Sequence, residues 1–512
     1  MCRSQSKSPK TGSDAVASHL YFGDFVYFQP LDLSFRNSLN VNIEKRSKST
    51  MHETITSGEI KVSPFDFISI QKLKITAGIN EHSSLYLVGI LPDTQKDKDL
   101  YTDNQTPIVV SIESELQSKT IFCGMITEIK VTAVANYYEL HVKAKSYTYL
   151  MDIKKHKRSF QDVQLSWHQL IRQIVKTYPQ GSCIFNTEEE ATKRIWVQYS
   201  ETDWEFIKRV ASHYHLGLFP YISQTGTRFY IGETEYGNQT IDSKEYMAVS
   251  QLEQFEYMKE HEKLNVKEAD YLMYTLKSNE FIELGEKVQF KKKSYYNQSL
   301  TYQLVNGVVE NTYVLVKKNG LKQPRSYGNK LTGVSIEGKV LAVAGDKVKV
   351  HLEIDKEQNK STAHWFPYST PAASPDGSGW YFMPEVKDSV RVYFPGNEEN
   401  EAFAISSIRE TGGNPEVKYI QTIYDKKVMF TKDSVIISAD GQATVTLSKN
   451  GGISISGGSI SINASQSITM RSEDTMNISA ADSVSLQSDQ GGKVILNESG
   501  EIKLNGTEVK IN

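Results

Sequence analysis

Two acidic side chains, Glu385 and Asp388, stand close enough in the sequence to suggest acid–base chemistry. Glycoside hydrolysis needs two carboxylates that face each other across a cleft. This pair, however, precedes the apolar alternation that begins at Val390, in a position typical of a hairpin turn. We therefore interpret both residues as solvated turn residues and expect that the protein is not an enzyme.

The closest histidine pair, His213 and His215, is the only candidate for metal ligation by neighbouring histidines. It falls at the end of a predicted helix, where residues i and i+2 do not share a face, so we expect no metal role. The sequence has neither a phosphate-binding G-x-x-x-x-G-K-[ST] loop nor a G-x-G-x-x-G that opens a helix. We expect no cofactor. The basic run 154–158 (KKHKR) is interpreted as a solvated loop rather than a nucleic-acid patch.

Two helices carry clear start signals in the middle of the chain. Ser166 and Gln169 form a capping box before apolar residues at helical spacing, and Thr202 with Glu205 forms a second one. Gly217 is the expected C-terminal stop of the second helix. These signals predict a small α+β part inside a chain whose other segments favour strands.

Most of the remaining sequence alternates apolar and polar residues, as strands do. Residues 21–150 predict a barrel or sandwich, and a hairpin is expected over 218–231. A polar link, 317–329, separates this part from a compact third unit. That unit, 338–405, contains about five short strands, which fits a small barrel of the OB type.

From residue 435 to residue 512 short apolar pairs recur at a spacing close to eight residues. The two apolar residues of each pair are separated by one residue, so both fall on one face of a strand. Turn-forming dipeptides such as Gly451-Gly452 lie between the pairs. We predict one short strand per octad, with the following residues in the interior of the repeat array: Val445, Leu447, Ile453, Ile455, Ile460, Ile462, Ile468, Met470, Met476, Ile478, Val484, Leu486, Val494, Leu496, Ile502 and Leu504.

The repeat array must be thin, because no aromatic residue follows Phe430 and no ring is present to fill a wide interior. Either one chain winds alone, with three octads to a coil, or three chains intertwine and each contributes one strand to a face. A single octad buries too little apolar surface to offset the entropy of ordering it, so stacked neighbours must stabilise it. The spacing does not decide between one chain and three.

The overall composition excludes several classes of protein. The formal net charge of the 512 residues is −3, so no strong field attracts nucleic acid or an acidic membrane. No apolar run reaches the roughly 18 residues that span a bilayer, and residues 1–20 lack the apolar core of a secretory signal. Three cysteines form no C-x-x-C motif. We expect synthesis in the cytoplasm without a signal peptide.

The segment 195–217 (IWVQYSETDWEFIKRVASHYHLG) resembles the signature of VgrG-type spike proteins and related contractile-tail hub proteins. The stretches 338–352 and 382–394 resemble the OB domain of that family, and the octads resemble its needle. Needle repeats of the family often carry Gly two residues after Val, where this chain has Ser, Thr or Asn. The residues that match the signature are Tyr199, Glu201, Asp203, Phe206, Arg209 and Gly217.

The resemblance implies a mainly β protein with tandem hub barrels, an OB-fold collar and an intertwined triple-stranded β-helix as needle. Its function would be that of a homotrimeric spike, which docks on the tail tube and mechanically punctures the target membrane when a sheath contracts. Expected partners are further copies of the chain, the tube protein, baseplate components and a PAAR-type tip protein, and delivery outside follows contraction. The expected parts are a disordered tail at 1–20, a hub at 21–330 with a helical insert at about 160–217, the collar at 331–410, a linker at 411–430 and the needle at 431–512.

Two other functions remain open at this point. A tail-associated cell-wall hydrolase would need a catalytic domain, and the short stretch from Arg409 to Lys427 leaves no room for one between collar and needle. A β-helical adhesin or tail fibre would need exposed aromatic residues or a terminal head domain, and the repeats supply neither. The parent machine, whether a phage tail, a type VI secretion system or an extracellular injection particle, is left open.

Overall fold

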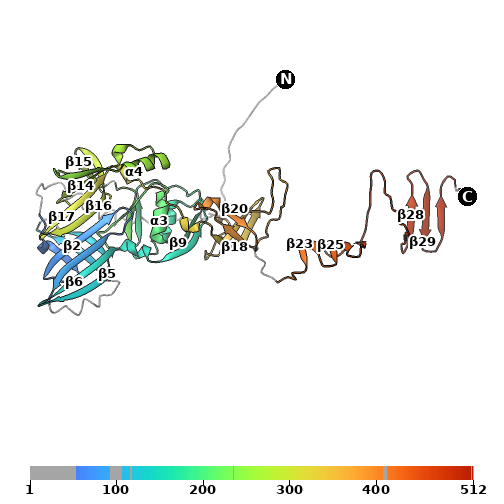
Figure 1. Cartoon of the computed structure of the whole chain (residues 1–512), viewed down its shortest axis with the longest axis horizontal. Helices are drawn as coiled ribbons and strands as arrows, with labels where there is room; N and C mark the ends of the chain where they lie inside the picture. The colour runs from blue at the N-terminus through green and yellow to red at the C-terminus, as the bar shows by residue number, and fades with distance from the viewer. Residues whose placement is uncertain are drawn as a thin grey trace, which may run out of the picture. The chain divides into compact units, whose positions relative to one another are not determined.

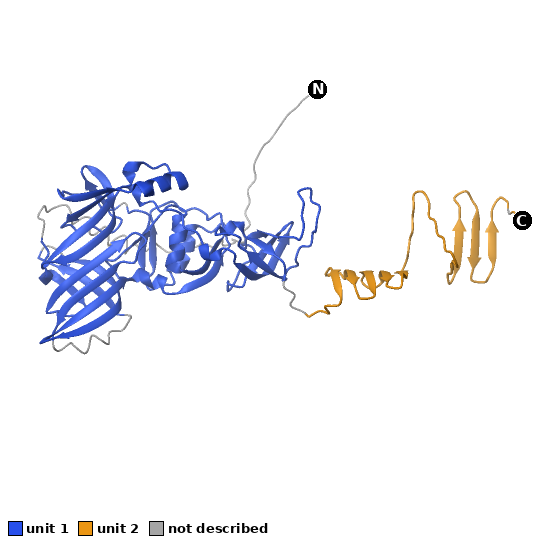
Figure 2. Cartoon of the chain, in the orientation of Figure 1, with its two compact units in different colours: residues 1–408 blue, residues 409–512 orange. Residues whose placement is uncertain are grey.

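The computed structural model describes residues 54–92, 106–115, 118–234, 236–407, 412–508 and 510. The expected tail, 1–20, lies outside these residues. The chain divides into two compact units, Met1–Ile408 and Arg409–Asn512, which Figure 2 shows in blue and orange. The protein is mainly β, as predicted, and the helices found among the described residues all lie in the first unit.

A single 12-stranded sheet passes through two barrels of the first unit (Figure 1). Alternate residues of its strands are buried, as the apolar alternation predicted; β4, for example, buries Ile108, Val110 and Ile112. The strand order in the first barrel is β1-β4-β5-β6-β3-β2. The bounds are β1 (Ile60–Ser63), β2 (Ser69–Gly78), β3 (Ser84–Leu91), β4 (Pro107–Glu113), β5 (Ser118–Val134) and β6 (Tyr137–Ser146).

The second barrel continues the same sheet, because β2 pairs with β16 in antiparallel register from Ser299 opposite Gly78 to Gln303 opposite Lys74. From β16 the order runs through β17 and β14 to β13, while β15 connects β16 to β12. A short helix, α4 (Leu252–Glu256), follows β13 and leads into a π-helical turn. The bounds are β12 (Gln239–Ile241), β13 (Tyr246–Ser250), β14 (Leu272–Ser278), β15 (Lys287–Phe290), β16 (Lys293–Val305) and β17 (Val308–Val316).

A helical module, residues 155–231, interrupts the two barrels and has its own apolar core. Both predicted helices are present: α2 (Trp167–Val175) begins at Ser166, whose hydroxyl accepts a hydrogen bond from the Gln169 amide, and α3 (Asp203–Ser212) begins with a complete Thr202–Glu205 capping box. The predicted hairpin is β10 paired with β11. The strands of the module are β7 (Lys155–Phe160), β8 (Ser182–Phe185), β9 (Trp196–Thr202), β10 (Leu218–Pro220) and β11 (Arg228–Ile231).

The basic run 154–158 is not a loop, and that prediction was wrong. Its residues enter β7, which pairs with β9 in antiparallel register. The exposed Lys155 and Lys157 alternate with the half-buried His156 and Arg158 in this strand. The lysine heads therefore reach solvent, while Arg158 pairs with the carboxylate of Asp203.

The third predicted part of the first unit is a five-stranded barrel, ordered β20-β19-β18-β21-β22. Its core includes Val350, Phe366, Val392 and Phe394, all fully buried. The long hairpin β18–β19 supplies the alternation that the sequence showed. The bounds are β18 (Ser335–Ala344), β19 (Lys347–Leu352), β20 (Trp365–Pro367), β21 (Ser389–Tyr393) and β22 (Phe403–Ile405).

The second unit consists of short antiparallel strands in two groups, a five-stranded meander and a three-stranded meander. The predicted apolar pairs lie opposite one another across the ladders; Val445 faces both Ile437 and Ile455, for instance. The bounds are β23 (Lys418–Gln421), β24 (Lys426–Phe430), β25 (Ser434–Ala439), β26 (Ala443–Ser448), β27 (Ile453–Ser456), β28 (Ser483–Gln487), β29 (Lys493–Asn497) and β30 (Ile502–Asn505).

Two stretches of the second unit differ from the prediction. Residues 457–482 contain three of the predicted apolar pairs but form no strand in this single chain. Conversely, β23 and β24 lie within 411–430, where we expected a linker. Both differences follow from the fact that a short strand is stable only beside a hydrogen-bonded neighbour.

Two further observations concern thiols and hydrophobic helices. Cys123 and Cys183 are free and buried, and burial raises the pKa of the Cys123 thiol to about 11 and that of Cys183 to about 12. No helix in the described part of the chain is both long and apolar enough to cross a lipid bilayer.

Candidate functional site

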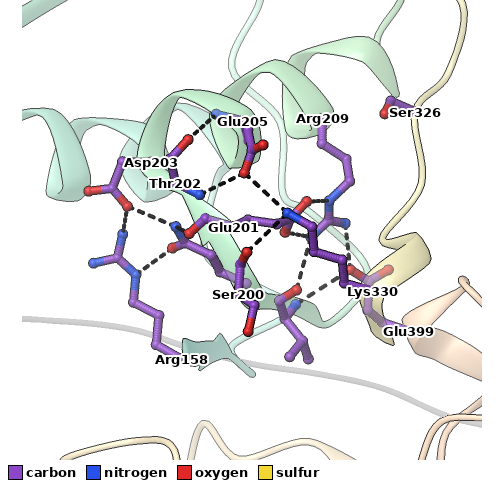
Figure 3. Close-up of polar contacts among 12 residues, drawn as sticks. Arg158, Ser200, Glu201, Thr202, Asp203, Glu205, Arg209, Ser326, Lys330 and Glu399 are labelled. Atoms are coloured by element: carbon purple, nitrogen blue, oxygen red, sulfur yellow. Dashed lines mark hydrogen bonds and ion pairs between the residues drawn. The ribbon is translucent and has the colours of Figure 1, made fainter. Parts of the chain in front are cut away.

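Arg209 is the centre of a buried ion network beside α3 (Figure 3). Only 2% of its side chain is exposed, yet every guanidinium nitrogen has a partner. Nε and Nη2 donate to the two carboxylate oxygens of Glu201 at 2.9 and 2.8 Å, and Nη2 also donates to the Val197 carbonyl. Nη1 donates to Oε1 of Glu399 at 2.7 Å. The fork geometry of arginine thus joins two carboxylates that lie 198 positions apart in sequence (399 − 201).

Glu399 brings the OB barrel into the network. It lies in a one-turn 3₁₀ helix, Glu399–Glu401, between β21 and β22, and its side chain is 1% exposed. Its second carboxylate oxygen accepts a hydrogen bond from Nη2 of Arg194 at 2.9 Å, and the same nitrogen donates to Glu398 at 2.7 Å. Two arginines of the helical module therefore hold one buried carboxylate of the barrel.

The charges of the network compensate one another. Burial by itself lowers the pKa of Arg209, but the attraction of Glu399 and the hydrogen bonds and attraction of Glu201 outweigh it, so the pKa is raised. Arg209 therefore stays charged although it is buried. Desolvated charges are tolerated only when each has close partners of opposite sign. The arrangement holds the helical module and the OB barrel in one geometry, and Glu201 and Lys330 also line a pocket beside it.

Asp203 organises a second cluster at the N-terminus of α3. Its side chain is 2% exposed; Oδ1 accepts from the amide of Gln198 at 2.9 Å and from Arg158, and Oδ2 accepts from the hydroxyl of Tyr178 at 2.7 Å. Arg158 also donates to Gln198 at 2.8 Å. Burial and the neighbouring carboxylate raise the pKa of Tyr178. A carboxylate in the first turn of a helix is additionally stabilised by the helix dipole.

The other signature residues pack around these clusters, and the ring centroid of Phe206 lies 5.2 Å from the guanidinium carbon of Arg209. Phe206 packs in the core of the module against Phe160, with ring centroids 5.5 Å apart. Tyr199 lies under the ammonium of Lys157, 4.6 Å from the ring centroid. Gly217 is required by close packing, because a Cβ there would lie 2.3 Å from Cδ1 of Ile79. Phe206 stabilises the module itself, whereas Tyr199 also packs against the core of the OB barrel and Gly217 allows close contact with Ile79, which follows β2.

Lys330 covers the exposed side of the network. Its ammonium donates to the carbonyl of Ser200 at 3.1 Å and lies 3.5 Å from the carboxylate of Glu205 (Figure 3). Ser200 has a positive φ of 55°, at the point where the β7–β9 ladder shifts register between Tyr199 and Glu201. This bulge turns Glu201 towards Arg209.

The other candidates from the sequence occupy structural positions. His213 lies beside Arg194 and the Ser326 carbonyl, and His215 beside the Gln323 carbonyl. Among the described residues, no group of three potential metal ligands comes together. The backbone amide of Glu385 donates to Asp388 at 2.8 Å within an exposed turn, the geometry expected of turn residues.

Sequence reasoning did not identify Arg158, Arg194 or Glu399. Glu399 stands in an acidic stretch that is typical of a solvated turn, and its partner is 190 positions away (399 − 209). One feature of the sequence pointed to a residue such as Glu399. Arg209 lies on the apolar side of a helix and therefore requires carboxylate partners, and Glu201 alone does not satisfy all of its hydrogen-bond donors.

Comparisons with known proteins agree with this division of the first unit. Residues 78–263 match the phage tail baseplate hub (GPD) family, and residues 336–408 match the type VI secretion system/phage-baseplate injector OB domain family. A search of curated protein sequences finds no match.

Solved structures show the same fold at low sequence identity. The E. coli c3393 protein is a component of the type VI secretion system with structural similarity to the T4 bacteriophage tail proteins gp27 and gp5. It is 12% identical, with a TM-score of 0.51, over 68% of this chain and 99% of its own. The Francisella PdpA–VgrG complex in its half-lidded form contains a chain that is 10% identical, with a TM-score of 0.51, over 83% of this chain and 92% of its own.

Proposed function

We propose, from the premise that this chain belongs to the VgrG-type hub-and-spike proteins, that three copies of it form the spike of a contractile injection apparatus. The matched families are baseplate hub and injector components, and the matched structures come from type VI secretion and phage tails. In this proposal residues 21–330 are the hub, 331–410 the collar and 431–512 the needle.

The observation that carries the proposal is the exposure of the apolar repeats in a single chain. Ile453, Ile462 and Met470 expose 70, 65 and 66% of their surface, although isoleucine and methionine are normally buried. Many of the other paired residues, such as Ile460, Ile468 and Leu504, are exposed as well, whereas Val445, Val484 and Val494 are half-buried, so much of the described unit presents an apolar face to water. Exposed apolar patches of this extent mark interaction sites.

Two further copies of the same chain are the partners that fit this face. The face repeats every octad or so along the unit, so a partner must repeat with the same period, as an identical chain does. Open grooves on both meanders are lined by residues of the repeats, among them Val445 and Ile455 in one and Val494 and Leu504 in the other. A closed ring of three chains would also pair every strand edge and leave none exposed.

The proposed work is mechanical. The hub docks on the tail tube, and sheath contraction drives the needle through the target membrane. Force from the hub reaches the collar through contacts such as Arg209–Glu399, which hold the OB barrel against the helical module. A PAAR-type protein is the proposed tip.

The mass of the purified full chain in solution tests the proposal. Light scattering on a gel-filtration column should give three times the 57.8 kDa of one chain. A folded monomer would contradict it, since one chain would then have to cover its own apolar repeats, and a surface-binding solenoid would become the better account.

A further inference from the structure

An open groove lies on the outer face of the OB barrel, across the neighbouring strands β18, β19 and β20. One row of paired residues crosses it: Ala342 in β18 lies opposite Lys349 in β19, and Lys349 lies opposite Trp365 in β20. Residues that oppose each other in a ladder point to the same face, and the residues next to them, such as Val350 and Phe366, are buried in the core on the other face. The groove has a volume of about 460 Å³, within the range of sites that hold small organic molecules.

The loop between β19 and β20 forms a wall of the groove and is held in place by Lys349. The ammonium of Lys349 donates to the carbonyls of Lys360 and Ser361 at 2.8 and 2.9 Å. Asn359 braces the same loop, because its Oδ1 accepts from the amide and from the hydroxyl of Ser361, each at 2.9 Å. The wall is therefore preorganised, and a ligand would bind without first having to order it.

The side chains of the groove combine one aromatic ring with polar and cationic groups. Trp365 exposes 36% of its surface, and the ammonium of Lys349 lies 5.1 Å from its ring centroid. A flat indole ring suits the apolar C–H face of a sugar ring, and the amide of Asn359 and the hydroxyl of Ser361 can form hydrogen bonds with sugar hydroxyls. Small barrels of the OB type bind oligosaccharides or oligonucleotides on the face of their second and third strands, which here are β19 and β20.

The charge of the groove favours an acidic ligand. Lys349 and Lys360 line the groove, and none of the described residues that line it is acidic. Lys347 adds a third, exposed ammonium on the same face of β19, since side chains two residues apart in a strand share a face. An ammonium has three donors, and the loop carbonyls use two of those of Lys349. A carboxylate or phosphate group of a ligand can accept from the remaining donors.

We propose that this groove binds an acidic oligosaccharide, with a sugar ring stacked on Trp365 and an acidic group beside Lys349 and Lys360. Single-stranded nucleic acid is acidic too, but it is held by several stacked rings along a longer basic groove. Trp365 is the one aromatic residue among the described residues that line this groove. The proposal goes beyond the spike function and rests on the barrel alone, so that it does not depend on the trimer.

Isothermal titration calorimetry on the full chain tests the proposal with defined probes. The acidic probes are tetragalacturonate and the tetrasaccharide of alternating N-acetylglucosamine and N-acetylmuramic acid, and at least one of them should bind. Neutral cellotetraose and an oligodeoxythymidine should bind at least about tenfold more weakly than that probe. Added salt should weaken the binding of the acidic probe, because it screens the lysine charges.

Matched pairs of variants locate the binding site. Trp365→Ala should weaken binding of the acidic probe by about tenfold, because the stacking ring is lost. Trp380→Ala should leave binding unchanged, since this tryptophan is 50% exposed in the loop between β20 and β21 of the same barrel and does not line the groove. Lys360→Gln should weaken binding by about threefold. Lys356→Gln is its control, because Lys356 is an exposed lysine of the same loop that does not line the groove.

The outcomes separate this proposal from that of the spike. Failure of both acidic probes to bind, equally tight binding of cellotetraose, or tighter binding of the oligodeoxythymidine would overturn the groove proposal. Equal losses in the two tryptophan variants would overturn it as well. A monomeric mass in solution would contradict the spike and leave the expected binding unchanged.

Discussion

At the scale of single residues, Arg209 illustrates how a buried charge can be both stable and indispensable. It is surrounded by Glu201, Glu399 and the Val197 carbonyl, and its guanidinium also lies 5.4 Å from the ring centroid of Trp196. The net contribution of such a network to stability is small, because desolvation offsets most of the attraction. Removal of one member, by contrast, should lower stability strongly, because the other charged groups remain buried without their partner.

Arg209→Met should therefore destabilise the first unit by about 3–5 kcal/mol, because two carboxylates lose their counter-charge while still buried. Urea unfolding followed by tryptophan fluorescence would measure it. Lys143→Met breaks the exposed pair with Glu128 and serves as a matched control, with an expected loss below about 1 kcal/mol. A loss for Arg209→Met as small as that of the control would show that the network is not buried in solution.

One buried histidine, His168, and two half-buried ones, His82 and His213, make stability depend on pH. Burial lowers the pKa of His82, His168 and His213 to about 4, from 6.5 in an exposed histidine. The unfolded chain then binds more protons than the folded chain between these values, so stability is lost as the pH falls from about 6.5 towards 4.

Unfolding midpoints measured from pH 7 to pH 4.5 should show this loss. His213→Gln should make the decline shallower, because one of the three titrations disappears. His261→Gln is the matched control, because this side chain is 63% exposed. An identical slope in both variants would mean that His213 is accessible to protons in the folded state.

At the scale of elements, α3 depends on its N-terminal cap. The hydroxyl of Thr202 accepts from the Glu205 amide at 3.1 Å, and the Glu205 carboxylate accepts from the Thr202 amide at 2.9 Å. The same hydroxyl donates to Asp152, which in turn faces His82 of the first barrel. The cap thus also ties the helix to the barrel.

Thr202→Ala should cost about 1–2 kcal/mol, at the upper end of the range for a lost cap, because the bond to Asp152 is lost as well. Thr202→Ser keeps the hydroxyl and should recover most of the loss. Thermal unfolding followed by circular dichroism would compare the two. Equal losses for both variants would point to the methyl group rather than to the cap.

Elements with local signals were the part of the fold that the sequence predicted best. Capping residues identified α2 and α3, and alternation identified the OB barrel, because both signals involve near neighbours. The basic run in β7 was misread as a loop, since a strand whose charged residues pair with a distant Asp203 looks like a solvated segment. Glu399 was missed for the same reason. Contacts between residues far apart leave no local pattern.

At the scale of the whole molecule, the predicted interior residues of the repeats remain a proposal. Ile468 is 52% exposed in the single chain, so a charge there has almost no effect on a monomer. It becomes costly only if other chains cover the site, because an unpaired charge would then be buried.

Ile468→Asp should therefore reduce the trimeric mass and make residues beyond 430 sensitive to protease. Thr469→Asp places the same charge on the opposite face of the predicted strand and should leave both properties unchanged. Limited proteolysis with mass spectrometry would compare them. A protease-resistant rod in the Ile468→Asp variant would show that the interior has been assigned to the wrong residues.

The ion network also has a consequence for how such a chain can drift in sequence. Loss of Arg209, Glu201 or Glu399 alone leaves a buried charge, whereas replacement of all three by apolar residues of similar volume is often neutral. Divergence at these positions must therefore occur in concert or not at all, while the exposed positions around them change one by one. The fold can therefore match a structure whose sequence is only 12% identical. Most positions of such a chain can change freely without loss of the fold.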